Sequence, residues 1–187
     1  MQKAFFLIVG PSGVGKTSLI KRLLADFPNK IYDTITCTTR SMRPGEQEGQ
    51  PYYFLTDQRF MELTKESYFA EWAVVHGYKY GTPKEELEKA WKKGFLIIMD
   101  IDIQGAQTLM KNYDLVSIFI HPPHIDSLIK RLNQRDDGKA ANLEKRMETA
   151  IKEIDLAHKC SYEIVNDNLE DAYAQLKKLV EESLNRL

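Results

Sequence analysis

The chain has 187 residues and a formal net charge of −1, with 43% hydrophobic and 28% charged residues. This length suits one compact domain with a substantial core. The sequence contains no long block of like charge, so it does not indicate an arm that binds nucleic acid. No apolar run approaches the roughly 18 residues that a membrane helix needs, so no membrane partner is expected.

Two further features bear on the cellular compartment. The six apolar residues that precede Gly10 are too few for a secretory signal peptide. The two cysteines, Cys37 and Cys160, lie far apart in the sequence, which favours free thiols in a reducing compartment. We therefore expect a cytoplasmic protein. The sequence does not distinguish between a monomer and a homodimer.

The first predicted elements are a buried strand over residues 4–9, a glycine-rich loop and a helix with apolar residues at helical spacing. The loop matches the pattern G-x-x-x-x-G-K-[ST] through Gly10, Gly15, Lys16 and Thr17. A strand that leads through such a loop into a helix surrounds a polyphosphate with backbone N–H groups. Lys16 can reach the β and γ phosphates, and the Thr17 hydroxyl can ligate Mg²⁺. The loop pattern predicts that a nucleoside triphosphate binds here. It does not indicate which molecule accepts the phosphoryl group.

Farther along, predicted strands and helices alternate. The strands are expected at 31–37, 52–55, 69–76, 95–99, 116–120 and 162–165. The helices are expected at 57–65 with Asp57 as N-cap, 83–94, after Asp102, 125–132, about 140–158, and from 169 onward. This alternation predicts an α/β fold with a parallel-sheet core and helices on both faces.

Two segments depart from that alternation. Residues 36–80 contain many turn signals, with Gly77 and Gly81 placed in turns, and predict a small mixed α/β insertion over the carboxyl edge of the sheet. The charged segment 135–146 predicts a helical lid. The expected boundaries are a core of about 1–33, 83–130 and 155–187, an insertion of about 34–82, and a lid of about 131–154.

Candidate anion-binding residues gather in the loop that follows residue 36. Arg40 and Arg43 lie three residues apart and can converge on one phosphate, although the two arginines taken alone favour a solvated basic turn. Tyr52 and Tyr80 stand beside glycine-rich turns and can donate to the same phosphate, or simply pack.

Three acidic residues have two interpretations each. Glu71 lies between large apolar residues, so it either faces outward from a strand or is buried where it could accept from the N–H groups of guanine. Asp100 and Asp102 follow a buried strand at the edge near the glycine-rich loop. An acidic residue there commonly holds Mg²⁺, and helix capping is the alternative.

Basic residues recur in the predicted lid. Arg131 and Arg135 are four residues apart and share a helix face, and Arg146 follows. A lid that carries arginines over the γ-phosphate would stabilise phosphoryl transfer, whereas each arginine alone could be an exposed helix residue.

Together these segments resemble the guanylate kinase family over nearly the whole chain. The matching blocks, in order, are GPSGVGKTS, TTRSMRPGEQEGQPYYF, EWAVVHGYKYGT, IIMDIDIQGAQ, RLNQR with Arg146 eleven residues on, and EIVNDNL. Differences from the usual pattern are Thr36 in place of serine, the run after Arg135, Gln50-Pro51 before Tyr52, and Tyr78-Lys79.

The resemblance implies a role for each candidate residue. ATP would bind to Gly10, Pro11, Ser12, Gly13, Val14, Gly15, Lys16, Thr17 and Ser18, with Asn166 and Asp167 near the adenine. GMP would bind to Thr36, Arg40, Arg43, Glu46, Tyr52, Glu71, Tyr80, Thr82 and Asp102. Thr17 and Asp100 would serve Mg²⁺, and the catalytic residues would be Lys16, Arg40, Arg131, Arg135 and Arg146.

The function implied is phosphorylation of GMP by ATP, with Mg²⁺, in guanine nucleotide metabolism. GMP and ATP are then the expected partners. Two alternatives stay open: a catalytically inactive guanylate-kinase-like module that binds phosphopeptides, and a kinase for another small phosphorylated acceptor.

Overall fold

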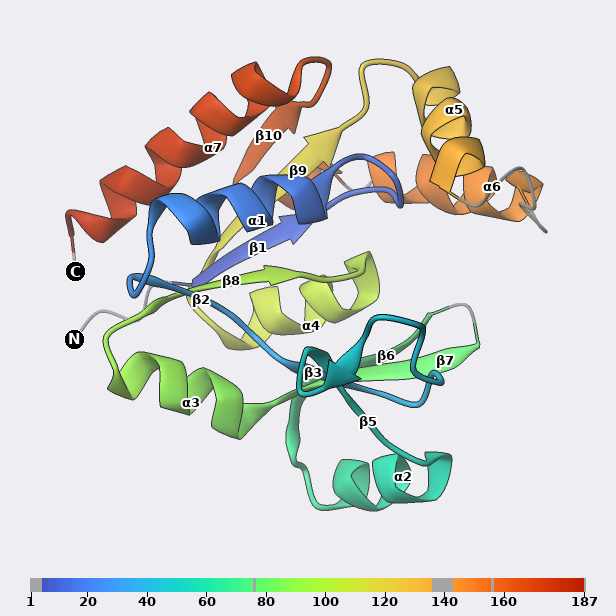
Figure 1. Ribbon diagram of the computed structural model, residues 1–187, viewed down its shortest axis with the longest axis vertical. Helices are drawn as coiled ribbons and strands as arrows, with labels where there is room; N and C mark the ends of the chain where they lie inside the picture. The colour runs from blue at the N-terminus through green and yellow to red at the C-terminus, as the bar shows by residue number, and fades with distance from the viewer. Residues whose placement is uncertain (1–4, 76, 136–142, 156, 187) are drawn as a thin grey trace.

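The computed structural model describes residues 5–75, 77–135, 143–155 and 157–186, without the side chains of 130, 132–135 and 143–146. Figure 1 labels its elements. The strands are β1 (Phe5–Val9), β2 (Ile31–Asp33), β3 (Thr36–Thr38), β4 (Gln47–Glu48), β5 (Pro51–Phe54), β6 (Phe69–Val75), β7 (Tyr78–Pro83), β8 (Leu96–Asp100), β9 (Val116–His121) and β10 (Tyr162–Val165). The helices are α1 (Lys16–Asp26), α2 (Asp57–Lys65), α3 (Lys84–Lys92), α4 (Ile103–Asn112), α5 (Ile125–Arg135), α6 (Leu143–Ile154), the short 3₁₀ helix Ala157–Lys159, and α7 (Leu169–Leu184).

The core sheet is parallel and has the strand order β10-β9-β1-β8-β2. Its central strands β1, β8 and β9 are nearly continuous apolar runs, as expected of strands buried on both faces. β1 lies at its centre and is followed by the glycine-rich loop. The carboxyl ends of β1, β8 and β9 therefore meet beside that loop, at the edge where ligands of open α/β sheets bind.

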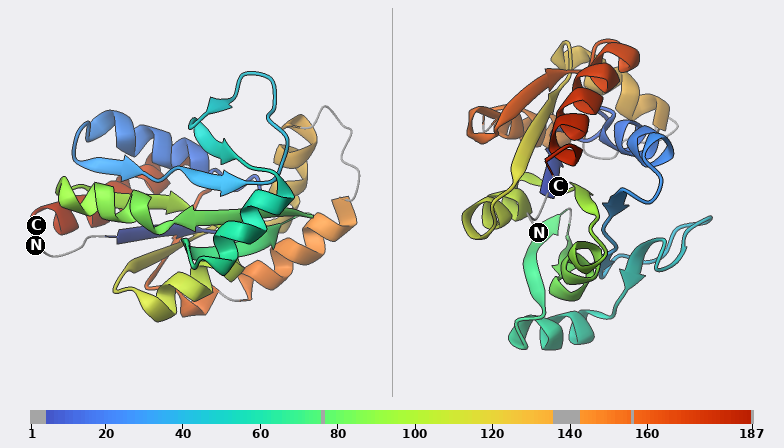
Figure 2. Two further views of the ribbon diagram at one scale, coloured as in Figure 1. Left: turned by 90° about the horizontal axis from the view of Figure 1, so that it is seen from below. Right: turned by 90° about the vertical axis from the view of Figure 1, so that its left-hand side faces the viewer.

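Helices cover both faces of the core sheet (Figures 1 and 2). Phe6 and Ile8 pack on one face with buried residues of α1 and α7, such as Leu23 and Leu176. The intervening residues of β1 pack on the other face with α3 and α4. This division follows from the alternation of side chains along a strand. The α/β class with helices on both faces is confirmed.

A second, small sheet has the order β4-β5-β3-β7-β6 and combines parallel and antiparallel pairs. It packs with α2 around a separate cluster of buried residues that includes Cys37, Phe60 and Phe69. Figure 1 shows this unit below the core sheet. The chain crosses between the sheets at residues 34–35 and again between β7 and α3.

Several local expectations differ from the structure. The predicted strand 31–37 is divided between two sheets. The N-cap of α2 is Thr56, whose hydroxyl accepts from the Arg59 N–H, rather than Asp57. Gly81 lies inside β7, where a Cβ atom would come within 2.9 Å of the Phe69 ring. The helix expected at about 140–158 is α6 followed by the 3₁₀ turn, and its first residues lie outside the described part.

Within the described ranges, none of the helices combines the length and apolar character required to cross a membrane.

Candidate functional site

The glycine-rich loop encloses the amino end of α1. The Lys16 ammonium donates to the Gly10 carbonyl at 2.6 Å and lies 3.6 Å from Asp100 Oδ1. Gly15 has φ +106°, and a Cβ there would overlap the Asn166 side-chain amide. That amide donates to the Val14 carbonyl at 2.7 Å. The loop therefore depends on glycine both for its backbone conformation and for the close approach of the segment after β10.

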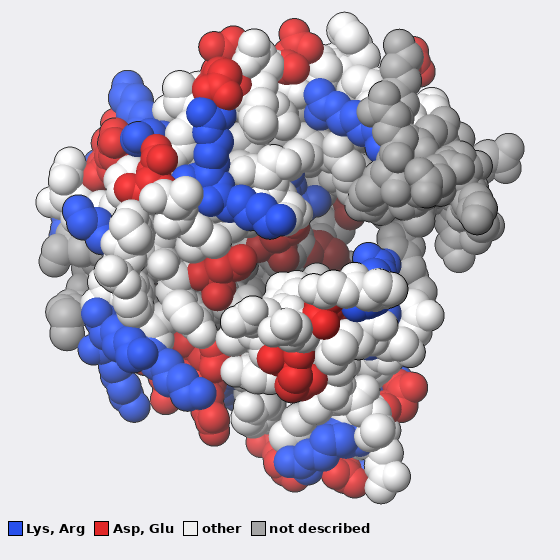
Figure 3. Space-filling view, in the orientation of Figure 1, with Lys and Arg blue, Asp and Glu red and all other residues white. Residues whose placement is uncertain are grey.

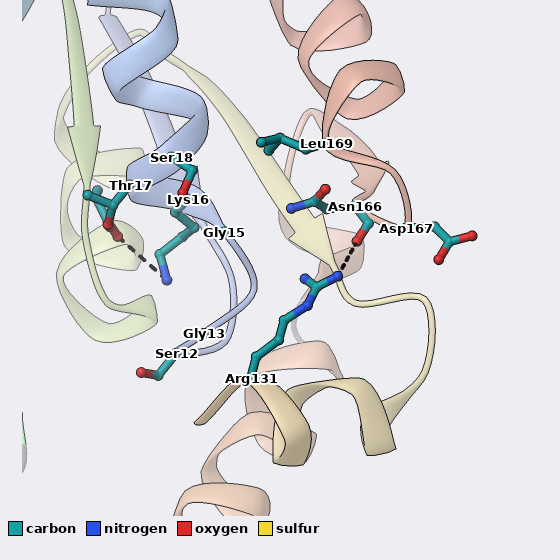
Figure 4. Close-up of a pocket in the computed structure, with 11 residues that line it drawn as sticks. Ser12, Gly13, Gly15, Lys16, Thr17, Ser18, Arg131, Asn166, Asp167 and Leu169 are labelled. Carbon is teal, nitrogen blue, oxygen red and sulfur yellow. Dashed lines mark hydrogen bonds and ion pairs between the residues drawn. The ribbon is translucent and has the colours of Figure 1, made fainter. Parts of the chain in front are cut away.

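A cavity of about 510 Å³ opens over this loop, and we call it the loop cavity. Its lining consists of Ser12, Gly13, Gly15, Lys16, Thr17, Ser18, Asp100, Arg131, Asn166, Asp167 and Leu169. Figure 4 shows how Arg131 reaches from α5 toward the segment after β10. Its guanidinium donates to the Val14 carbonyl at 3.3 Å and the Asn166 carbonyl at 3.2 Å. Arg131 is thus held at the glycine-rich loop.

Thr17 and Asp100 place two oxygen ligands side by side. The Thr17 hydroxyl donates to Asp100 Oδ2 at 3.2 Å. Hydroxyl and carboxylate oxygens suit Mg²⁺, which usually completes its shell with waters and substrate phosphates. Among the described residues, no group of three or more His, Cys, Asp or Glu could hold a metal on its own. The pair therefore fits a cation that arrives with a polyphosphate.

A second cavity, of about 370 Å³, lies between the core sheet and the small sheet, and we call it the inter-sheet cavity. Its lining includes Gly10, Ser12, Lys16, Thr17, Asp33, Thr34, Thr36, Tyr52, Glu71, Tyr80, Thr82, Asp100, Asp102 and Glu153. Figure 3 shows a hollow between the two units with acidic side chains in its depth.

Glu71 is buried in this cavity, so the outward-facing alternative is excluded. It is 4% exposed and accepts a 2.6 Å hydrogen bond from the Thr82 hydroxyl. Gly105 of α4 permits the approach, because a Cβ there would stand 2.5 Å from Glu71 Oε2. Burial raises the pKa of the Glu71 carboxyl to about 7, and the negative charge of Asp102 adds to the effect.

Asp102 both caps α4 and lines the cavity. Its Oδ1 accepts from the backbone N–H of Gln104 at 2.8 Å and of Gly105 at 3.4 Å. Burial raises its pKa, although these two hydrogen bonds oppose the shift. Capping and a pocket-lining role thus coexist in one residue, and the Glu71 and Asp102 carboxylates form an acceptor-rich end of the cavity.

Arg40, in the loop that follows β3, is held in a fixed orientation. Its guanidinium makes a bidentate pair with Glu46 at 2.8 and 3.1 Å and lies 5.4 Å from the Tyr52 ring centre. Glu46 also accepts from the backbone N–H of Arg43 at 2.8 Å. Tyr52 and Tyr80 line the cavity, whereas Arg43 is exposed. Arg40, Arg43 and Glu46 are not among the residues that line the cavity.

The remaining candidates are distributed as follows. Pro11 and Val14 are buried beneath the glycine-rich loop. Arg135 ends α5 and Arg146 lies in α6, but their side chains lie outside the described part of the chain. The run 136–142 also lies outside it.

Sequence reasoning missed several residues of the site. Asp33, Thr34 and Glu153 line the inter-sheet cavity, Leu169 lines the loop cavity, and Gly105 contacts Glu71. Burial raises the pKa of the Asp33 and Glu153 carboxyls to about 7, and the negative charge of Asp100 adds to the effect. Only Gly105 had a signal in the sequence, because a glycine inside a predicted helix often marks a close approach.

The two cavities share part of their walls. Ser12, Lys16, Thr17 and Asp100 line both of them. A group bound in one cavity can therefore meet a group bound in the other at the Lys16 ammonium.

Comparison with known proteins identifies the relatives of this chain. The family model described as guanylate kinase matches residues 2–183. The chain belongs to the guanylate kinase family. The guanylate kinase of Bdellovibrio bacteriovorus is 43% identical over 185 residues, covering 98% of this chain and all of that protein. The guanylate kinase of Thermotoga maritima is 38% identical over 96% of this chain and 87% of its own length.

The fold is that of the family as well. The crystal structure of guanylate kinase from Anaplasma phagocytophilum superposes with a TM-score of 0.77 at 29% sequence identity. The match covers 97% of this chain and 86% of that one. Both the sequence comparisons and the fold therefore confirm membership in the family, which the sequence blocks predicted.

Proposed function

We propose that this protein is a guanylate kinase that transfers the γ-phosphoryl group of ATP to GMP, giving ADP and GDP. The observation that carries the proposal is the shared wall of the two cavities at Ser12, Lys16, Thr17 and Asp100. ATP occupies the loop cavity with its γ-phosphate at Lys16. GMP occupies the inter-sheet cavity, with its phosphate directed to the same ammonium.

The acidic end of the inter-sheet cavity supports guanine as the acceptor base. Guanine presents a ring N–H and an amino group on one edge, and these are donors for carboxylates such as Glu71 and Asp102. Adenine has no ring N–H at that position and would leave a carboxylate oxygen of the cavity without a donor, which is costly. Thr36 and Thr82 supply further hydroxyl groups in the same cavity.

The opposite end would hold the GMP phosphate. Tyr52 and Tyr80 can donate their phenol groups to it, and Arg40 lies near the Tyr52 ring with Glu46 fixing its guanidinium. Arg43, three residues farther along the same loop, is proposed to join it. The acceptor atom is an already ionised phosphate oxygen, so the reaction requires no general base.

Catalysis then consists of positioning and charge stabilisation. Lys16 neutralises charge at the point where the two cavities meet, and Arg131 contributes from α5. Arg135 and Arg146 are proposed to join it. Thr17 and Asp100 would hold Mg²⁺, which when bound neutralises charge on the phosphates of ATP. We place this reaction in the guanine nucleotide metabolism of the cytoplasm.

A coupled assay with ATP and Mg²⁺ across GMP, dGMP, AMP, CMP and UMP tests the proposal. We expect GDP from GMP and little turnover of AMP, CMP or UMP. Failure to form GDP, or equal phosphorylation of AMP, would refute it. The alternative of an inactive phosphopeptide-binding module gains no support from the geometry, because such a module needs neither Lys16 nor Thr17 at a formed loop cavity.

A further inference from the structure

One buried carboxylate joins the two sheets outside both cavities. Glu86 lies in the first turn of α3, directly after the second crossing between the sheets, and is 3% exposed. Tyr32 lies on β2, directly before the first crossing. Tyr53 lies on β5 of the small sheet. None of the three lines the loop cavity or the inter-sheet cavity.

The carboxylate contacts both units at once. The Tyr32 hydroxyl donates to Glu86 Oε2 in a short hydrogen bond. The Tyr53 hydroxyl donates to Oε1 at 3.5 Å, and Lys89 donates to the same oxygen at 3.2 Å. Glu86 therefore connects a core strand, a small-sheet strand and the helix that follows the crossing.

The two tyrosine contacts are unequal. The bond to Tyr32 is short, whereas the bond to Tyr53 is at the limit of hydrogen-bonding distance. The small-sheet side of the connection is thus the loose side. A small rotation of the small sheet would shorten or break the Tyr53 bond first and leave the Tyr32 bond intact.

A buried carboxylate at this place needs a reason, because burying a charged group is unfavourable unless it is hydrogen-bonded. Its neighbours Leu87 and Ala90 already provide the apolar face of α3. Each of the two Glu86 oxygens instead accepts from a tyrosine of a different unit, Tyr32 of the core and Tyr53 of the small sheet, and so restricts where those side chains lie.

We propose that Glu86 is a positioning residue that sets the orientation of the small sheet relative to the core sheet, through Tyr32 on one side and Tyr53 on the other. Its effect on the reaction rests on the proposed function, since GMP binding draws on residues of both units. Without the Tyr53 bond the inter-sheet cavity is less often assembled, and GMP binds more weakly. The loop cavity belongs almost entirely to the core, so ATP binding is unaffected.

Tyr53→Phe tests the loose side of the connection while keeping the aromatic ring. Tyr68→Phe is the matched control, because both rings pack against the same cluster of Cys37, Phe60, Leu63 and Phe69. We expect Tyr53→Phe to weaken GMP binding about two- to threefold, the low end of the effect of a hydrogen bond, with ATP binding unchanged. Tyr68→Phe should leave both affinities unchanged.

A second measurement does not depend on any nucleotide. Spin labels placed at Lys21→Cys on α1 and Lys65→Cys on α2, both exposed, report the distance between the two units. Tyr53→Phe should broaden this distance distribution in the ligand-free protein, and Glu86→Gln should broaden it as well. If the distributions of Tyr53→Phe and wild type coincide, the proposal is wrong.

The two measurements test the positioning role of Glu86 separately from the proposed function. If wild-type protein does not phosphorylate GMP, the proposed function fails and the spin-label distances alone decide the role of Glu86. If wild type is active and Tyr53→Phe weakens ATP and GMP binding equally, the role of Glu86 is general stability and the proposal is overturned.

Discussion

The Thr82 hydroxyl donates a 2.6 Å hydrogen bond to the Glu71 carboxylate, and both side chains are buried in the wall of the inter-sheet cavity. This bond fixes one carboxylate oxygen and leaves the other able to accept from a ligand. Glu71 is therefore oriented before any substrate arrives.

The substitution Glu71→Gln should lower the affinity for GMP without lowering the affinity for ATP. It keeps the shape of the side chain but replaces one acceptor oxygen with a donor, which opposes the donors of guanine. We expect GMP affinity to fall about 100-fold, as for the loss of two hydrogen bonds to a charged group. ATP affinity, measured by calorimetry, should change less than twofold. Equal losses for both nucleotides would contradict the assignment of Glu71 to guanine.

The same substitution should alter how stability depends on pH. In the folded protein burial raises the pKa of Glu71 from 4.5 to about 7, so the folded state binds a proton that the unfolded state releases. Stability from this group is therefore greatest below pH 4.5 and declines as the pH rises to about 7. Relative to wild type, Glu71→Gln should gain about 2–3 kcal/mol between pH 5 and pH 8. Urea unfolding at several pH values measures this, and a difference that does not vary with pH would argue against it.

Gly105→Ala should destabilise the protein, although glycine to alanine inside a helix ordinarily stabilises by about 1 kcal/mol. The added Cβ would stand 2.5 Å from Glu71 Oε2 and 2.8 Å from the Ile101 side chain. We expect a lower Tm and weaker GMP binding. Gln104→Ala, at the exposed neighbouring position of the same helix, is the control and should leave GMP binding unchanged. A rise in Tm for Gly105→Ala would show that Glu71 can move aside.

Glu46→Gln should impair GMP binding through Arg40. The Arg40 and Glu46 side chains are only 7% and 18% exposed, and a neutral amide cannot hold the guanidinium as firmly as a carboxylate. We expect the KM for GMP to rise about tenfold, in keeping with one charge-assisted hydrogen bond. Glu62→Gln, which breaks the exposed 3.1 Å pair with Arg59, should leave KM unchanged. If the KM for GMP is the same in both variants, Arg40 does not need the Glu46 carboxylate for GMP binding.

Asp100→Asn should weaken the response to Mg²⁺. An amide retains the Thr17 contact but lacks the charge that attracts a divalent cation. We expect the Mg²⁺ concentration for half-maximal activity to rise about tenfold, and the Mg²⁺-dependent thermal stabilisation by ATP to shrink in parallel. Asp114→Asn, at an exposed position, serves as control. An unchanged Mg²⁺ response would remove Asp100 from the metal site.

The core sheet could be predicted because its central strands β1, β8 and β9 are mostly apolar and its loop has a specific pattern. The carboxyl ends of parallel strands meet at one edge, so Asp100 was expected beside Lys16, and the two lie 3.6 Å apart. The proposed boundaries of the insertion and lid, and the roles of individual site residues, stay predictions.

The orientation of Glu71 could not be predicted from strand alternation. The pairing of β6 with β7 has an irregularity between Phe69 and Glu71. Such an irregularity redirects the side chains that follow it. As a result Glu71 is buried while Trp72 is 41% exposed, the reverse of what their polarity suggests. Asp33 and Glu153 were missed for a different reason: they reach the cavity from β2 and α6, and only the tertiary fold brings these together.

The common wall at Ser12, Lys16, Thr17 and Asp100 also has a consequence for inhibition. Since no protein side chain needs to separate the two nucleotides there, a single molecule could span both sites. An adenosine and a guanosine joined through a chain of phosphates would bring both bases to their own cavities, and would gain the affinity of each while losing rigid-body freedom only once. Selective inhibitors of this protein could be built on that linked scaffold.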